Sequence, residues 1–223
     1  MVLTGKRVLI HGKNSGIDKA IVGKLTDLGA ELVHLSQSNI SCIESDVRNI
    51  LNESGPFDGF VFTFMHSDFR PLQLVKPDVV SEIINDNYAV FVETMRVLRK
   101  NKGLKNGSSV VALSSISSIR AMKAKMVFCS SKAALDAAIR CLAVELADKG
   151  IRFNSIQKGV VDTDFEKDHI MDVTAINEGL AEKMTPLGHS TAEEVANVVA
   201  FLLSDATRTI TGSSIVIDGG YSL

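Results

Sequence analysis

The chain has 223 residues, of which 45% are hydrophobic and 22% are charged, as in an ordinary soluble globular protein. The formal net charge of -2 gives no electrostatic basis for binding nucleic acid or an anionic membrane. No apolar run approaches the roughly 20 residues that a membrane-spanning helix needs.

The three cysteines, Cys42, Cys129 and Cys141, are an odd and scattered set without metal-ligand spacing, so no metal site is expected. An odd cysteine count without a signal-peptide pattern predicts a reducing, cytoplasmic location. We find no internal repeat or linker-like stretch, and we therefore expect a single domain over residues 1–223.

The N-terminal part of the sequence predicts a β–α–β unit. Residues 7–11 (RVLIH) and 31–35 (ELVHL) are short apolar runs that predict buried strands. Between them, a glycine turn at residues 12–16 leads into a segment with helical spacing of its apolar residues, which are Ile17, Ala20, Ile21, Leu25 and Leu28.

Strand and helix patterns alternate along the rest of the chain. Strands are predicted at residues 57–64, 109–113, 152–156 and 214–217. A long helix should follow Pro77, with apolar positions Val80, Ile84, Phe91, Met95 and Leu98. Residues 128–149 predict a helix that is apolar around much of its circumference, and Thr191 with Glu194 forms a capping box before a helix at 195–203.

This alternation predicts an α/β fold of the Rossmann type. We expect a doubly wound parallel sheet covered by helices on both faces, in three α/β/α layers. Ligands bind such sheets at the carboxyl ends of the strands. The turn at residues 12–16 (GKNSG) has the place of an anion-binding loop, because its backbone N–H groups and the helix N-terminus attract negative charge. Such a glycine pair alone is equally compatible with a plain strand-to-helix turn.

Four further motifs accompany the glycine turn. Ser114-Ser115 follows the strand SVVAL, and Lys132 lies in FCSSKAALDAA. NSIQKG occupies residues 154–159, and the C-terminal part runs PLGHSTAEEVANVVAFLLSDATRTITGSSIVIDGG. Together, over essentially the whole chain, these motifs resemble the short-chain dehydrogenase/reductase family.

The resemblance implies hydride transfer between a nicotinamide and a small carbonyl or alcohol substrate. It assigns three catalytic positions: Ser115 to hold the substrate oxygen, Lys132 to bind the nicotinamide ribose, and Asn87 to support a proton relay. Taken singly, Ser115 reads as an ordinary loop serine, Lys132 as a snorkelling lysine and Asn87 as a satisfied buried amide. The tyrosine that the family uses as its acid is replaced by Phe128.

The resemblance also implies a set of cofactor-binding residues. They are Gly12, Lys13, Asn14, Ser15, Gly16, Ile17, Ser36, Asp46, Val47 and Lys132. The second strand ends at Ser36-Gln37 without the acid that holds an NAD ribose, which favours NADP over NAD, although no arginine is present there for a 2′-phosphate.

Several positions depart from the family pattern. Asp18 replaces the third glycine of the turn, and a carboxylate there should repel a pyrophosphate. Residues 62–65 (FTFM) replace a small motif, and Lys158-Gly159 replaces a proline-glycine pair. Only residues 36–45 separate the second strand from Asp46-Val47, which predicts that the crossover helix there is shortened or missing.

Three functions remain open from the sequence. The first is an oxidoreductase with impaired or altered catalysis, and the second is a non-catalytic descendant that binds a ligand or a partner subunit. The third is a lyase or isomerase using His66, Asp68, His169 or Asp172. The resemblance further implies a homodimer or homotetramer, formed through the helix at 128–149 and the last strand, with residues 161–186 as the substrate loop.

Overall fold

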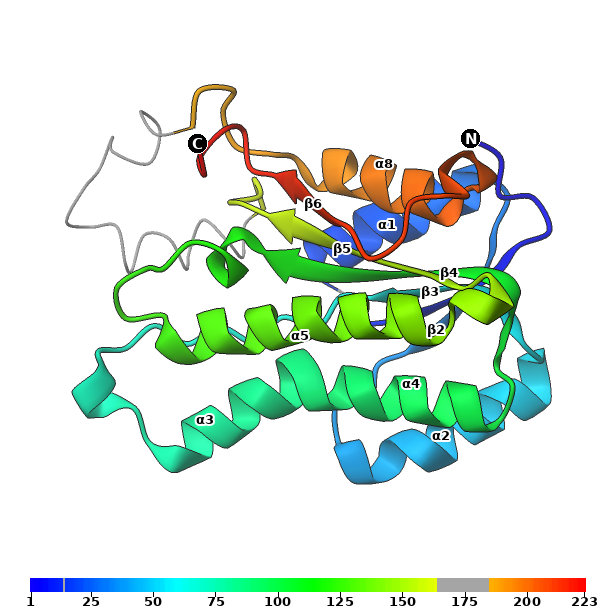
Figure 1. Cartoon of the computed structure of the whole chain (residues 1–223), viewed down its shortest axis with the longest axis horizontal. Coiled ribbons are helices and arrows are strands. Elements are labelled where there is room, and N and C mark those ends of the chain that lie inside the picture. Colours follow the sequence, from blue (N-terminus) through cyan, green and yellow to red (C-terminus); the bar gives the residue numbers. More distant parts are fainter. Residues whose placement is uncertain (14, 164–184) are drawn as a thin grey trace.

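A six-stranded parallel sheet forms the centre of the protein (Figure 1). The computed structural model describes residues 1–13, 15–163 and 185–223. The strand order is β2-β1-β3-β4-β5-β6, and every neighbouring pair is parallel. The strands are β1 (Arg7–His11), β2 (Glu31–Leu35), β3 (Phe57–Phe62), β4 (Leu104–Ser115), β5 (Arg152–Lys158) and β6 (Ser214–Ile217).

Helices cover both faces of this sheet, and Figure 1 shows α1 and α8 on one side and α2, α3, α4 and α5 on the other. Among the described residues, no helix is long and apolar enough to cross a membrane. The α-helices are α1 (Gly16–Asp27), α2 (Ile40–Ser54), α3 (Pro77–Ile84), α4 (Val90–Lys100), α5 (Met126–Glu145) and α8 (Ala192–Leu203). Short 3-10 turns lie at Leu72–Leu74, Ile116–Ser118, Ala147–Lys149 and Asp205–Thr207.

The two faces of the sheet have different cores. Beneath α1 and α8 the core is almost entirely aliphatic, because β1, β3 and β4 present Val8, Val61 and Val111 there. On the opposite face, phenylalanines of β3 meet α4, and the rings of Phe60 and Phe91 stack with centroids 6.2 Å apart. Burying each such ring stabilises the fold by about 1.5–3 kcal/mol. The Rossmann-type, three-layer α/β prediction is therefore confirmed.

The predicted strands agree with the structure apart from their ends. β3 stops at Phe62 rather than at residue 64, and β4 extends from Leu104 to Ser115 around the predicted core of 109–113. The helix after Pro77 is interrupted by a π-helical turn, η2 (Asn85–Ala89), between α3 and α4. This turn shifts the helical register, so Ile83 is buried whereas Val80 is 36% exposed.

The prediction of a missing crossover helix was wrong. The 15-residue helix α2 joins β2 to β3, and Asn39 caps it by accepting a hydrogen bond from the Ser41 N–H at 3.1 Å. Asp46 and Val47 lie inside α2, where Val47 packs in the core one helical turn after Ile43. Dinucleotide-binding folds have the strand order 3-2-1-4-5-6, in which a third strand lies outside the second. Here β2 is the edge strand, so the sheet lacks that outer strand.

A buried arginine joins β5 to the end of α8. Arg152 donates to the carbonyl oxygens of Leu202 and Ser204 at 2.9 and 3.2 Å, and to the Thr207 hydroxyl at 2.7 Å. The last carbonyls of a helix have no partner within the helix, and a cation near them is favourable. Burial lowers the pKa of Arg152, and the charge of Asp205 acts in the opposite direction.

We expect Arg152→Ala to reduce the free energy of unfolding by about 2–4 kcal/mol, because it leaves buried carbonyls unsatisfied. Urea unfolding of the variant measures this loss. Arg208→Ala is the matched control, since Arg208 directly follows Thr207, a partner of Arg152, and is exposed. Equal stability of the two variants would contradict this assignment.

Candidate functional site

The carboxyl ends of all the strands meet at one edge of the sheet. The ends of β1 and β3 touch there, because the Thr63 N–H donates to the His11 carbonyl oxygen at 2.9 Å. A Cβ atom on Gly12 would lie 1.9 Å from the Thr63 hydroxyl oxygen, so only glycine fits this position. The glycine turn is therefore held against β3 before α1 begins at Gly16.

Asp18 closes the N-terminus of α1 with its own carboxylate. Its Oδ2 accepts a hydrogen bond from the Ser15 N–H at 2.6 Å, and the Ser15 hydroxyl accepts one from the Asp18 N–H at 3.3 Å. Asp18 is buried, and its Oδ1 has no hydrogen-bond partner in the described part of the chain. Asp18 therefore lies at the predicted anion-binding turn, as expected. Its carboxylate accepts the hydrogen bond of the Ser15 N–H, a backbone donor that could otherwise bind an anion.

Lys13 also has a partner inside the protein. Its Nζ forms a salt bridge with Asp86 at 2.8 Å and lies 5.4 Å from the centre of the Phe64 ring. Burial acts to raise the pKa of the Asp86 carboxyl, but the hydrogen bonds from Lys13 and Asn85 outweigh it, so the pKa is lowered. Lys13 therefore bridges the glycine turn and the π-helical turn η2. Asn14, also predicted to bind cofactor, lies outside the described residues.

Two pockets lie on either side of Asp18, which lines both. One has a volume of about 260 Å³ and is lined by Lys13, Ser15, Gly16, Ile17, Asp18, Thr63, Met65, Leu113 and Thr163. The other, of about 520 Å³, is lined by Ile10, Gly12, Asp18, Lys19, Val22, Gly23, His34 and Ser36. Most of the predicted cofactor-binding residues are thus gathered in two adjoining hollows along the strand-end edge.

Lys132 is fully buried where α5 meets the sheet. Its Nζ donates hydrogen bonds to the carbonyl oxygens of Phe64 and Leu113, at 2.9 and 3.1 Å. Burial lowers the pKa of Lys132 to about 7, and nearby Lys158 lowers it further while Asp136 raises it. A lysine ammonium has three donors, so one remains for a ligand while the other two bind the carbonyls.

Asn87 lies in the π-helical turn with its side chain fully buried. Its amide nitrogen donates to the His66 carbonyl oxygen at 2.8 Å and to the Ser131 hydroxyl at 3.0 Å. Its amide oxygen accepts from the His66 N–H at 2.8 Å. Both N–H donors of the Asn87 side chain are thus used. They connect η2 to α5 and to the segment that follows β3, so Asn87 fixes the relative positions of these three elements.

Ser115 and Phe128 face the same end of the sheet from β4 and α5. The Ser115 hydroxyl accepts a hydrogen bond from the Ser117 N–H at 3.1 Å and remains 8% exposed. The Phe128 ring is nearly buried and packs edge-on against Phe69, with centroids 6.3 Å apart. Phe128 precedes Lys132 by one helical turn and carries no proton to donate.

The predicted cofactor-binding residues that follow β2 are Ser36, Asp46 and Val47, and only Ser36 lines one of these two pockets. Ser36 lines the larger pocket, as expected for a residue that directly follows β2. Asp46 instead receives a 3.3 Å hydrogen bond from the Gln37 side chain, and Val47 is part of the hydrophobic core. Both Asp46 and Val47 belong to α2.

A family model described as enoyl-(acyl carrier protein) reductase matches residues 3–222. L-xylulose reductase of Caenorhabditis elegans is 30% identical over 243 residues, covering 98% of this chain and 96% of that protein. The chain belongs to the short-chain dehydrogenase/reductase family.

Solved structures agree with this assignment. A short-chain dehydrogenase family protein from Francisella tularensis matches with a TM-score of 0.86 and 25% identity, over 97% of this chain and 98% of its own. The structure of BdcA in complex with NADPH matches with a TM-score of 0.81 and 24% identity, over 97% and 94% of the two chains, which shows the shared fold.

Two features of the strand-end edge of this short-chain dehydrogenase/reductase carry no sequence motif. Lys19 and His34 line the larger pocket beside Ser36, although neither belongs to a recognised pattern. His11 is fully buried, with Nε2 2.7 Å from the Gln37 carbonyl oxygen and Nδ1 3.1 Å from the Thr94 hydroxyl. The position of His11 at the end of a predicted strand did not indicate that both ring nitrogens would have hydrogen-bond partners.

The two described residues considered for a lyase or isomerase have different partners. His66 pairs with Asp86, with the His66 Nδ1 3.2 Å from the carboxylate, whereas Asp68 pairs with Arg70. His169 and Asp172 lie outside the described residues. Within the described ranges, no group of three or more His, Cys, Asp or Glu side chains is arranged to hold a metal.

Burial of His11 predicts a pH-dependent stability. Desolvation lowers the pKa of His11 to about 4 from 6.5, so the folded protein favours the neutral ring. The unfolded chain therefore binds more protons between these values, and stability should fall as the pH drops from about 6.5 to about 4. The full effect is on the order of 3 kcal/mol, since one pKa unit is worth about 1.4 kcal/mol.

Thermal unfolding across this pH range, compared with His11→Gln, measures the contribution of the ring. The glutamine side chain keeps a donor and an acceptor but does not titrate. The variant should show a shallower fall in melting temperature than the parent protein. An unchanged pH dependence would assign the effect to other groups.

Proposed function

We propose that this protein is an NAD(P)H-dependent oxidoreductase acting on a small carbonyl or alcohol, with turnover slowed by Phe128. The observation that carries the proposal is the meeting of Ser115, Lys132 and the glycine turn at one sheet edge, in a chain that matches the family over its length. The name of the relative L-xylulose reductase makes a ketose a suitable first substrate to test.

The strand-end edge suits a dinucleotide in most respects. Two adjoining pockets follow the ends of β1, β2 and β3, and a relative of the same fold was solved in complex with NADPH. Ser36 leaves the end of β2 without the acid that favours NAD, while Lys19 offers positive charge to a 2′-phosphate and the His34 ring lies in the same pocket. These features favour NADP, and the residue that opposes binding is Asp18.

The bound cofactor would supply the hydride, and the chain's own residues would orient the substrate and manage the proton. The Ser115 hydroxyl would hold the substrate oxygen, with the remaining donor of Lys132 directed to the cofactor ribose. Because Phe128 has no hydroxyl, the proton would come from the Ser115 hydroxyl or from water. Loss of a positioned general acid slows such reactions by roughly 10²–10⁴-fold.

A non-catalytic role is the second candidate, as a ligand-binding or structural subunit. Asp18 favours it, because its carboxylate already occupies the Ser15 N–H that a pyrophosphate would use. In this case the two pockets would hold a smaller or uncharged ligand. The two candidates differ in whether NADPH or NADH binds at all.

A homodimer formed through α4 and α5 is also part of the proposal. An apolar groove of about 710 Å³ runs between these helices, lined among others by Val92, Ala138 and Leu142. The side chain of Val144 nearby is 81% exposed. A monomeric mass in light scattering at micromolar concentration would contradict this part of the proposal.

We expect NADPH to bind more tightly than NADH, and Asp18→Gly to tighten NADPH binding by about tenfold. Removing the carboxylate frees the Ser15 N–H and removes a like charge, and tenfold corresponds to about 1.4 kcal/mol. Calorimetric titration measures both effects. Asp27→Gly is the control, because Asp27 is an exposed aspartate on the same helix. Absence of binding in both the parent and Asp18→Gly at millimolar cofactor would favour the non-catalytic role.

Phe128→Tyr should raise the turnover number for reduction of L-xylulose by about 10² or more, since it restores a positioned general acid. The oxidation of NADPH, followed by absorbance, measures this change. Phe69→Tyr is the control, because it adds a hydroxyl to the ring that packs against Phe128. If both variants remain inactive on a panel of ketoses and aldehydes while NADPH binds, the slowed-reductase proposal fails.

A further inference from the structure

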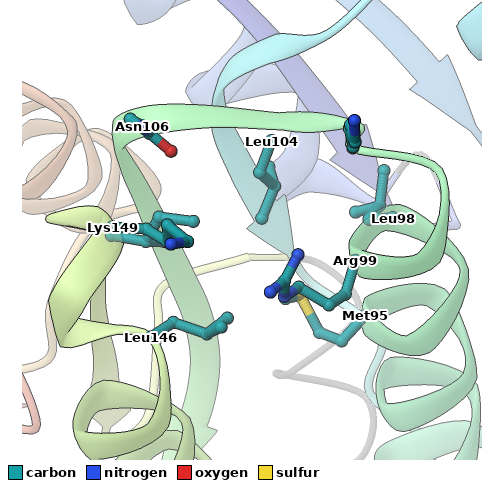
Figure 2. A pocket seen from close by; sticks show the side chains of 9 residues that line it. Met95, Leu98, Arg99, Leu104, Asn106, Leu146 and Lys149 are labelled. Carbon is teal, nitrogen blue, oxygen red and sulfur yellow. The ribbon is translucent and has the colours of Figure 1, made fainter.

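A separate pocket lies at the opposite edge of the sheet, where β4 begins (Figure 2). It has a volume of about 260 Å³ and lies between the end of α4, the start of β4 and the 3-10 turn that follows α5. Along α5, Leu146 at this pocket is 14 residues from Lys132, or about 21 Å at the helical rise of 1.5 Å per residue. The pocket is therefore distinct from the strand-end site.

Three cations surround this pocket. They are Arg99, Lys102 and Lys149, and Figure 2 shows Arg99 and Lys149 extending into it from opposite walls. Lys149 pairs with Asp148 at 2.8 Å, whereas Arg99 and Lys102 form no salt bridge with any described residue. The sequence has no aspartate or glutamate between Glu93 and Asp136, so no acid of that stretch offsets the charge.

The backbone at Lys102 is unusual for a lysine. Its φ of 55° is in the left-handed region, which non-glycine residues seldom adopt. The following residue, Gly103, is buried against Leu51 and Leu98, and a Cβ atom there would lie 2.9 Å from each side chain. This tight turn is what brings Lys102 to the rim of the pocket directly after α4 ends.

The interior of the pocket is apolar. Met95 and Leu98 of α4 form one wall, Leu146 and Ile151 form the other, and Leu104 of β4 covers it. The volume equals roughly nine water molecules at about 30 Å³ each, which is too small for a peptide helix. Apolar walls below a cationic rim suit a molecule with a short hydrocarbon body and an anionic head.

We propose that this pocket binds a small amphipathic anion, such as a medium-chain carboxylate, independently of the strand-end site. Arg99 and Lys102 would hold the anionic head, because neither forms a salt bridge with an acid of the described chain, although the charge of Arg99 helps to lower the pKa of Asp148. The hydrocarbon body would lie against Met95, Leu104 and Leu146. Arg99 offers the planar pair of donors that matches a carboxylate.

Titration of the full chain with octanoate tests the proposal, followed by calorimetry or by backbone amide NMR shifts around the pocket. We expect saturable binding with one site per chain. Arg99→Glu and Lys102→Gln should each weaken binding by about tenfold or more, since charge-assisted hydrogen bonds are the strong ones. Met95, Arg99 and Leu146 line both this pocket and the α4–α5 groove, whereas Lys102 lines this pocket and not the groove. The Lys102 variant therefore separates binding in this pocket from effects on a subunit interface.

Matched controls define what would overturn the proposal. Lys24→Glu on α1, which changes the net charge as Arg99→Glu does, and Ser115→Ala at the strand-end site should both leave octanoate binding unchanged. Octanol and inorganic phosphate should each bind far more weakly than octanoate, because each lacks one half of the recognition. Absence of octanoate binding at millimolar concentration, or binding insensitive to Arg99→Glu, would refute the proposal, whatever the outcome with NADPH.

Discussion

The strand-end edge depends on the close approach of β1 and β3 at Gly12. With a Cβ position only 1.9 Å from the Thr63 hydroxyl oxygen, any side chain at residue 12 would displace the Thr63 side chain from this contact. This contact places Ser15 at the N-terminus of α1 and Asp18 one turn further, against the Ser15 N–H. The position of both pockets follows, because Asp18 lies between them.

The polar groups of this edge mostly satisfy one another. Asp18 binds the Ser15 N–H, Lys13 binds Asp86, and Lys132 binds two carbonyl oxygens. Buried polar groups are costly when unpaired, so these hydrogen bonds stabilise the protein without a ligand. A dinucleotide would have to displace some of them, and the free energy of breaking those hydrogen bonds would reduce its affinity.

The two ends of helix α5 differ in the side chains that they present to the protein. Near its start, Lys132 is buried and its pKa is lowered to about 7, while its amine donates hydrogen bonds to the carbonyl oxygens of Phe64 and Leu113. Near its end, Leu146 contributes an apolar wall below exposed cations. The same helix therefore carries a desolvated amine at the proposed catalytic edge and supports an anion-attracting pocket at the other.

The sequence by itself determined the strands, the capping box of α8 and the family, because these depend on local periodicity and on motifs of near neighbours. It indicated Asp18 and Phe128 as departures from the family pattern. Only the tertiary structure decided that α2 is a full helix containing Asp46 and Val47, since that depends on which side chains reach the core. Interactions between residues far apart in the chain likewise decide three other features. These are the π-helical turn, the hydrogen bonds that occupy the Asn87 amide, and the burial of His11. Burial and hydrogen-bond partners are set by the packing of whole elements, which no local pattern records.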